Sequence, residues 1–148
     1  MARTTDRVSQ AKSSLMTDAE RLRYLTLALR VLGAIAIFGI YPLTVYWPSG
    51  WAWHSGRSEY LEMIIAIYAT LGVFLIIAAK NPKAHLSLIS FAIWSSIVHG
   101  AVMAFQSALN LQHIHHLYGD VLALFVIAAV LGYLSPEALL LRFARNAA

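Results

Sequence analysis

Two histidines and one aspartate in the second half of the chain have the residue types and the spacing of a metal site. His113, His116 and Asp120 follow the pattern H-x-x-H-x-x-x-D. If one helix begins at His113, the three side chains share a face, because three and seven residues are close to whole helical turns. Neutral imidazoles and carboxylates bind divalent metals such as zinc. The pattern predicts such a site, completed by Glu62, although its spacing is less specific than a HExxH motif.

Polar residues in two other apolar stretches widen this group. Ser95, His99 and Gln106 are four and seven residues apart, so they form a polar face on one helix, and Glu59 lies one turn before Glu62 on another. We expect these groups to converge with the first set beside His54 and Arg57. The expected ligand-binding residues are Glu59, Glu62, His99, Gln106 and Asp120.

Three interpretations of this His/carboxylate cluster compete, because ionisable groups inside a membrane are costly and normally face protein or water. The first is a small-ligand or metal site. In the second, Glu62, His99 and Asp120 handle protons in an intramembrane enzyme or a proton-linked carrier for a lipid-like molecule, although no nucleophile or cofactor motif supports catalysis. In the third, the polar groups only cap or join helices, and the protein is an accessory or scaffold subunit of a membrane complex.

Composition restricts the cofactors and partners. The chain has no cysteine, which excludes thiolate metal sites, iron–sulfur clusters and cysteine nucleophiles. Haem is not expected, because His99 has no second histidine at its own depth to act as an axial ligand. The net charge is +4, but the basic residues lie at the chain ends and in one short loop, so nucleic acid is not an expected partner.

The elements that must position these residues are membrane-spanning helices. Of the 148 residues 59% are hydrophobic and 12% are charged, which is more apolar surface than one soluble core of this size can bury. Apolar runs separated by Pro, Gly and polar residues predict an all-α bundle with four spans. The spans are expected at about 25–46, 61–79, 86–109 and 117–134.

The rest of the chain is assigned from local patterns. Thr17 and Glu20 have capping-box spacing, so the first helix should begin there. Residues 1–16 resemble a disordered cytoplasmic tail, residues 17–136 form the transmembrane domain, and residues 137–148 are a tail or a short surface helix. The last apolar run, Val121 to Leu134, is too short to span hydrocarbon about 30 Å thick, so its helix should begin near Leu117 or earlier and take Asp120 into the membrane.

Lysine and arginine predict the orientation. They concentrate before the first span, between the second and third, and after the fourth, which places both termini in the cytoplasm and the polar cluster in the outer half of the membrane. Trp47, Trp51, Trp53 and Tyr60 are then expected to form an aromatic belt at the outer interface.

Small residues repeat every four positions in the third span and predict a close helix contact or a surface for a partner or a second copy. They are Ala92, Ser96, Gly100, Ala104 and Ala108.

Several stretches together resemble a known family. They are YPLTVYWPSGWAWHSG, EYLEMIIAIYATLGVFLIIAAKNP, WSSIVHGAVMAFQ and HLYGD, and the likeness covers about Arg23 to Pro136. The family consists of small bacterial four-helix membrane proteins and is described only as a domain of unknown function. The resemblance implies four spans in a bacterial cytoplasmic membrane, but no activity, cofactor or site residue.

Overall fold

A computed structural model describes residues 16–53 and 56–139 of the chain. The described residues form helices and no strand, and four helical segments are long and apolar enough to cross a membrane. The predicted all-α fold with four spans is therefore confirmed. The tail before Met16, the residue His54 and the segment beyond Leu139 lie outside the described residues.

The first span is divided by a wider helical turn. Helix α2 (Asp18–Ala34) continues through a π-helical turn, η1 (Ile35–Gly39), into α3 (Ile40–Tyr46). Pro42 of α3 has no N–H and its ring would clash with the carbonyl four residues earlier, which accounts for a wider turn just before it. At the start of α2 the predicted capping box is present: Glu20 N–H donates to the Thr17 hydroxyl over 3.3 Å, and Thr17 N–H donates to the Glu20 carboxylate over 2.9 Å.

The remaining elements alternate long helices with short ones. They are α4 (Pro48–Trp51), α5 (Glu59–Ala78), the 3₁₀ helix η2 (Pro82–His85), α6 (Leu86–Leu109), the 3₁₀ helix η3 (Leu111–Tyr118), α7 (Asp120–Leu134) and α8 (Pro136–Leu139).

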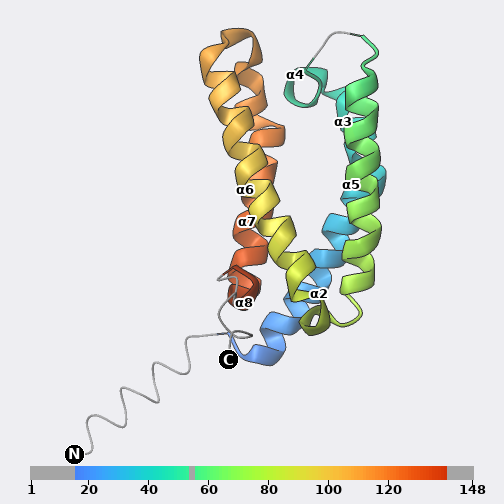
Figure 1. Ribbon diagram of the computed structural model, residues 1–148, viewed down its shortest axis with the longest axis vertical. Coiled ribbons are helices and arrows are strands. Elements are labelled where there is room, and N and C mark those ends of the chain that lie inside the picture. The colour runs from blue at the N-terminus through green and yellow to red at the C-terminus, as the bar shows by residue number, and fades with distance from the viewer. Residues whose placement is uncertain (1–15, 54–55, 140–148) are drawn as a thin grey trace, which may run out of the picture.

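The four spans form two antiparallel pairs. Helix α2 packs on α5, and α6 packs on α7, whereas α5 and α6 make few contacts although they are adjacent in sequence. Figure 1 shows the two pairs close together at the end where α2 begins and α8 lies, and apart at the other end, where α4 lies between them. We call these the α8 end and the η3 end.

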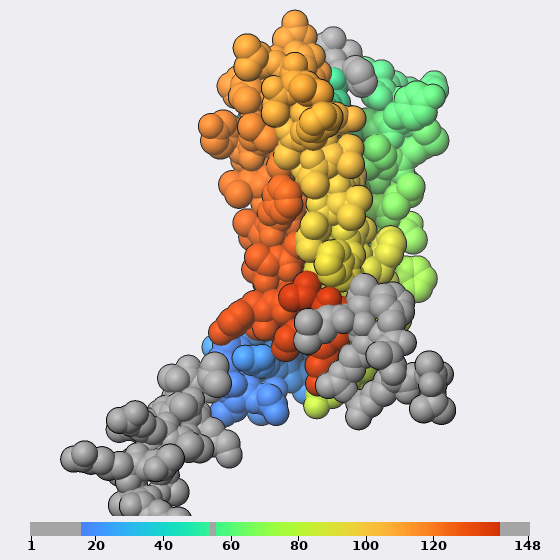
Figure 2. Space-filling model, turned by 60° about the vertical axis from the view of Figure 1, so that its left-hand side comes forward, coloured from blue at the N-terminus to red at the C-terminus, as the bar shows by residue number. Residues whose placement is uncertain are grey.

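The core lies at the α8 end. Leu29, Ile89, Ile93 and Leu131 are completely buried there and belong to one apolar cluster that joins all four spans. Large side chains such as Phe38, Ile67 and Phe105 are more than 60% exposed instead, as expected for surfaces that contact lipid. The space-filling view in Figure 2 shows α6 flanked by α7 on one side and α5 on the other.

Close backbone contact fixes the α2–α5 pair. A Cβ atom added to Gly33 would lie 2.7 Å from the Gly72 carbonyl oxygen, and one added to Gly72 would lie 2.6 Å from the Gly33 carbonyl oxygen. Only glycine at both positions allows these backbones to approach so closely.

The fourth span begins differently from the prediction. A single α-helix from Leu117 or His113 was expected, but His113 and His116 lie in η3 and α7 begins only at Asp120. The chain turns at Gly119, where a Cβ atom would overlap the Gly50 carbonyl of α4. The close packing of α4 against η3 therefore interrupts the helix between the histidines and the aspartate.

Candidate functional site

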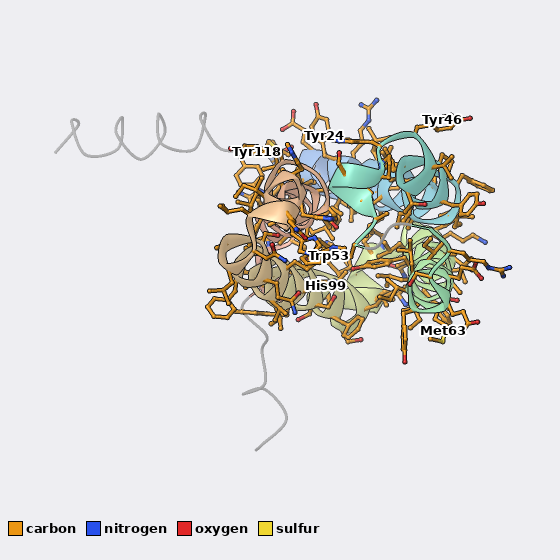
Figure 3. The ribbon with its side chains drawn as sticks, turned by 90° about the horizontal axis from the view of Figure 1, so that it is seen from above. Tyr24, Tyr46, Trp53, Met63, His99 and Tyr118 are labelled. Carbon is orange, nitrogen blue, oxygen red and sulfur yellow. The ribbon has the colours of Figure 1, made fainter. Side chains whose placement is uncertain are left out.

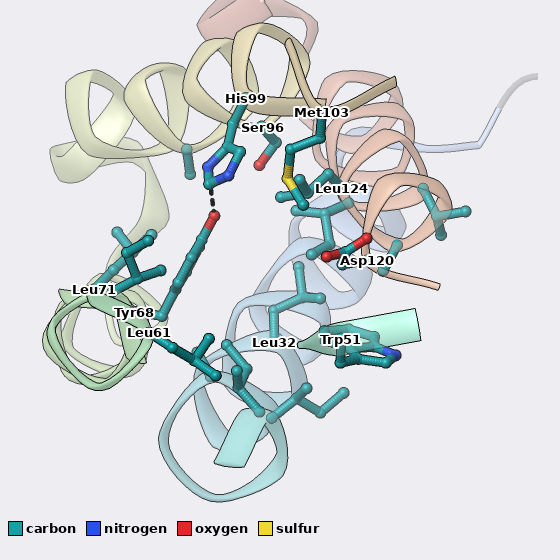
Figure 4. Close-up of a pocket in the computed structure, with 18 of the residues that line it drawn as sticks. Leu32, Trp51, Leu61, Tyr68, Leu71, Ser96, His99, Met103, Asp120 and Leu124 are labelled. Atoms are coloured by element: carbon teal, nitrogen blue, oxygen red, sulfur yellow. Dashed lines mark hydrogen bonds between the residues drawn. The ribbon is translucent and has the colours of Figure 1, made fainter. Parts of the chain in front are cut away.

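A cavity of about 500 Å³ lies between the two helix pairs, and we call it the inner cavity. It extends from Trp51 and Asp120 at the η3 end to Leu32 and Ala92 above the core, and all four spans contribute to its wall (Figure 4). Most lining side chains are aliphatic. The polar or aromatic ones are Trp51, Trp53, Tyr68, Ser96, His99, Gln106 and Asp120.

A hydrogen bond crosses the cavity between the two pairs. The Tyr68 hydroxyl of α5 and Nδ1 of His99 in α6 are 2.9 Å apart, and Figure 4 shows this contact spanning the space between the helices. Both side chains are partly buried. Because α5 and α6 otherwise make few contacts, this bond contributes to the separation at which the two walls are held.

Asp120 is at the centre of a second polar group, at the first residue of α7. Its Oδ2 accepts a hydrogen bond from Trp53 Nε1 over 3.1 Å and lies 3.0 Å from His116 Nδ1, and its Oδ1 accepts one from Val121 N–H over 2.8 Å. His116 is 2% exposed and Asp120 is 8% exposed. An ionised carboxylate only accepts hydrogen bonds, so with Asp120 ionised the proton of this contact lies on Nδ1 of His116. The first turn of a helix also favours a negative charge.

Trp53 connects this group to the surface of the η3 end. Its ring stacks on His116 with centroids 4.3 Å apart and on His113 with centroids 4.9 Å apart. Seen from this end in Figure 3, Trp53 lies toward the middle of the bundle, whereas Tyr46, Met63 and Tyr118 point outward. The expected aromatic belt is thus divided, because Trp51 and Trp53 line the cavity while Tyr60 is exposed.

A second cavity, of about 460 Å³, lies on the other side of Trp53, and we call it the end recess. Polar side chains from α4 and η3 dominate its wall, including Ser49, Gln112, His113 and His116. Asp120 lines the inner cavity, His116 lines the end recess, and Trp53 lines both. The His116–Asp120 pair therefore connects the two spaces.

The two glutamates do not join this arrangement. Glu62 is exposed and pairs with Arg57, whose Nε lies 2.7 Å from Glu62 Oε1, and this hydrogen bond and charge raise the pKa of Arg57. Glu59 is also exposed, in the first turn of α5, and neither glutamate lines the inner cavity.

The four residues predicted to bind metal do not meet at one point. In residues 16–53 and 56–139 no three His, Asp or Glu side chains are grouped closely enough to hold a metal ion. His116 uses one ring nitrogen on Asp120, His113 stacks on Trp53, and Glu62 pairs locally with Arg57. Of the predicted ligand-binding residues, the structure brings His99, Gln106 and Asp120 to the inner cavity.

The small-residue stripe of α6 is used inside the protein. Ala92, Ser96 and Gly100 are buried, Ala104 is half-buried and Ala108 is exposed. A Cβ atom at Gly100 would lie 3.3 Å from the Phe125 ring of α7, so α7 packs closely against α6 at this position. Ala92 and Ser96 also line the inner cavity, where a small side chain leaves space.

Sequence reasoning missed the contribution of α5. Leu61, Ile64, Tyr68, Leu71 and Leu75 all line the inner cavity, and their spacing of three, four, three and four residues is that of one helix face. Tyr68 carries the one hydroxyl among these five residues. That hydroxyl, inside an apolar span, was the sequence signal that could have identified this face as part of the site.

Comparison with known proteins places the chain in a family. Residues 19–146 match the family of unknown function DUF6632. The chain belongs to DUF6632. No curated protein and no solved structure matches it. DUF6632 is a family of unknown function.

Proposed function

We propose that this DUF6632 protein binds a small, largely apolar molecule in the inner cavity. The observation that carries the proposal is the cavity itself: about 500 Å³, bounded by all four spans, with an aliphatic wall and a few polar groups. Ligand sites in proteins have this volume and this composition, and they often lie between the helices of a bundle.

Two polar contacts lie in the wall of the cavity. Tyr68 and His99 join α5 to α6, and Trp53 joins the segment after α4 to Asp120 of α7. Packing alone would favour closing the space, because dispersion contacts are lost along an unfilled wall. The combination of a maintained separation and convergent polar groups favours binding over a purely structural role.

The location of the site in the membrane belongs to the same proposal. We infer from the distribution of lysine and arginine that the η3 end faces outward and that the cavity lies in the outer half of the membrane. The resemblance to small bacterial membrane proteins suggests a bacterial cytoplasmic membrane. A metal-binding role has less support, because the described histidines and carboxylates do not gather. A scaffold role also has less support, because the stripe at Gly100 is covered by α7 of the same chain.

A matched pair of substitutions on α7 tests the proposal. Ala123 lines the inner cavity, whereas Ala129 on the same helix is exposed toward lipid. Protein in lipid nanodiscs is extracted with organic solvent and the bound small molecules are quantified by mass spectrometry against empty nanodiscs. We expect a stoichiometric apolar compound with wild type and Ala129→Phe, and its loss with Ala123→Phe. Equal recovery of the compound from both variants contradicts the proposal. So does the absence of any such compound from wild-type protein taken from its source membrane.

A further inference from the structure

We propose that the inner cavity selects lipophilic organic cations and that protonation of His116 releases them. This inference rests on the proposed function and adds the chemical class of the ligand and the control of its binding. It is carried by the position of one buried carboxylate between the inner cavity and the end recess.

The wall of the inner cavity carries an acidic group. Asp120 is the acidic residue in the wall of the inner cavity, and among the described residues no Lys or Arg lines that wall. The salt-bridge partner of Asp120 in this part of the chain is His116, which carries a charge only when protonated. With a neutral imidazole, the pair leaves one negative charge beside an apolar space. A charge in such a low-dielectric site attracts a cation far more strongly than a charge in water does.

Aromatic side chains form part of the same wall. The rings of Trp51, Trp53 and Tyr68 line the same cavity as Asp120. In Figure 4, Trp51 and Asp120 lie on one side of the space and Tyr68 lies across from them. Aromatic faces attract organic cations, and the attraction is larger where water is excluded. The aliphatic side chains around them suit the apolar groups of the same ligand, which distinguishes it from a hydrated inorganic ion.

His116 can receive a proton from the end recess. Nδ1 of His116 is engaged with Asp120, so a proton from solution adds at Nε2, and the His116 ring lines the end recess. The resulting imidazolium neutralises the carboxylate and removes the attraction for a cation. Histidine is the side chain that changes charge between pH 5 and 8, so neutral to alkaline pH should favour binding and acidic pH release.

Other titratable groups face the pair from the elements around it. His113 of η3 stacks on Trp53 next to His116, while Tyr68 of α5 and His99 of α6 line the inner cavity opposite Asp120. Protonation of His113 or His99 would also oppose a bound cation, so it acts in the same direction. The assignment of the pH dependence to His116 therefore requires a substitution at His116 itself.

The experiment compares two probes of nearly equal shape that differ in charge. Phenyltrimethylammonium is the cation, and tert-butylbenzene is its neutral counterpart. Full-length protein in nanodiscs carries ¹⁵N in its tryptophan indoles, and the N–H signals are assigned by single Trp→Phe variants. Trp51 and Trp53 report on the inner cavity, while Trp94, whose indole donates to the Leu139 carbonyl at the α8 end, is the internal reference.

The expected result has three parts. At pH 8 the cation shifts the Trp51 and Trp53 signals at a concentration about tenfold lower than the neutral probe requires. At pH 5.5 this preference disappears. Asp120→Asn removes the preference at both pH values but still binds the neutral probe, while Glu62→Gln, which removes an exposed charge outside the cavity, behaves as wild type. His116→Gln keeps the preference at both pH values.

Each alternative outcome is informative. If both probes bind equally to wild type at pH 8, the charge selection is wrong although the proposed function stands. If neither probe shifts Trp51 or Trp53, the proposed function fails as well. A cation preference that persists at pH 5.5 in wild type overturns the role of protonation. These wild-type measurements decide the inference even if Asp120→Asn does not fold.

Discussion

The Tyr68 hydroxyl and the His99 imidazole meet 2.9 Å apart and join the two helix pairs where their backbones have already separated. Figure 4 places this contact opposite Asp120 across the inner cavity. The bond therefore contributes to the separation of the two walls as well as to stability.

Removing the Tyr68 hydroxyl should destabilise the bundle slightly. Tyr68→Phe loses one hydrogen bond between membrane helices, which is worth about 1 kcal/mol. Unfolding of purified protein in mixed micelles by a denaturing detergent measures this loss. Tyr60→Phe is the control, because that side chain is 77% exposed and its hydroxyl has no hydrogen bond to another described residue. A double-mutant cycle with His99→Phe should show that the two substitutions are not additive; full additivity would mean that the bond contributes nothing.

The glycine contact between α2 and α5 should not tolerate a methyl group. Gly72→Ala places a Cβ atom 2.6 Å from the Gly33 carbonyl oxygen, so the helices must move apart, at a cost of about 1–3 kcal/mol. The same unfolding assay measures the effect. Gly132→Ala is the matched control, because its nearest neighbour would be 3.5 Å away, an ordinary contact. Equal stability of the two variants would show that α2 and α5 do not approach so closely.

The Trp53–Asp120 hydrogen bond should stabilise the packing of Trp53 against η3 and the start of α7. Trp53→Phe keeps an aromatic ring for stacking on His116 but removes the indole donor to the carboxylate. Hydrogen bonds to charged groups are worth about 1.5–3 kcal/mol, so we expect faster amide hydrogen exchange in η3 and in the first turn of α7. Exchange in the core around Ile93 should be unchanged. Trp47→Phe, on an exposed side chain of the same segment, should leave η3 protected.

The orientation of the bundle can be tested in a background without cysteine. Gln112→Cys introduces an exposed thiol at the η3 end, and Ala84→Cys introduces one in η2 at the α8 end. With the termini in the cytoplasm, a membrane-impermeant maleimide should label only Gln112→Cys in intact spheroplasts. Ala84→Cys should react after the membrane is permeabilised. The reverse pattern would place the inner cavity in the cytoplasmic half.

The four spans follow from the sequence alone. Their lengths and hydropathy match the bilayer, where each backbone group must be satisfied within its own helix. The capping box at Thr17 and Glu20 is equally local, since both partners lie within one turn. The start of the fourth membrane helix was not local: a single α-helix from Leu117 or His113 was expected, whereas α7 begins at Asp120 after the 3₁₀ helix η3.

The tertiary structure decided which polar groups meet. Trp53 is 67 residues from Asp120, and Tyr68 is 31 residues from His99, so no helical spacing relates them. Glu62 instead found a local partner in Arg57, which kept it out of the predicted cluster. Helices that are apolar on every side carry little periodic signal for their neighbours, and lipid offers no hydrophobic force that selects one face. Close backbone contacts instead join α2 to α5 at Gly33 and Gly72, and η3 to α4 at Gly119 and Gly50, and in the resulting arrangement the carboxylate of Asp120 lies beside an apolar cavity.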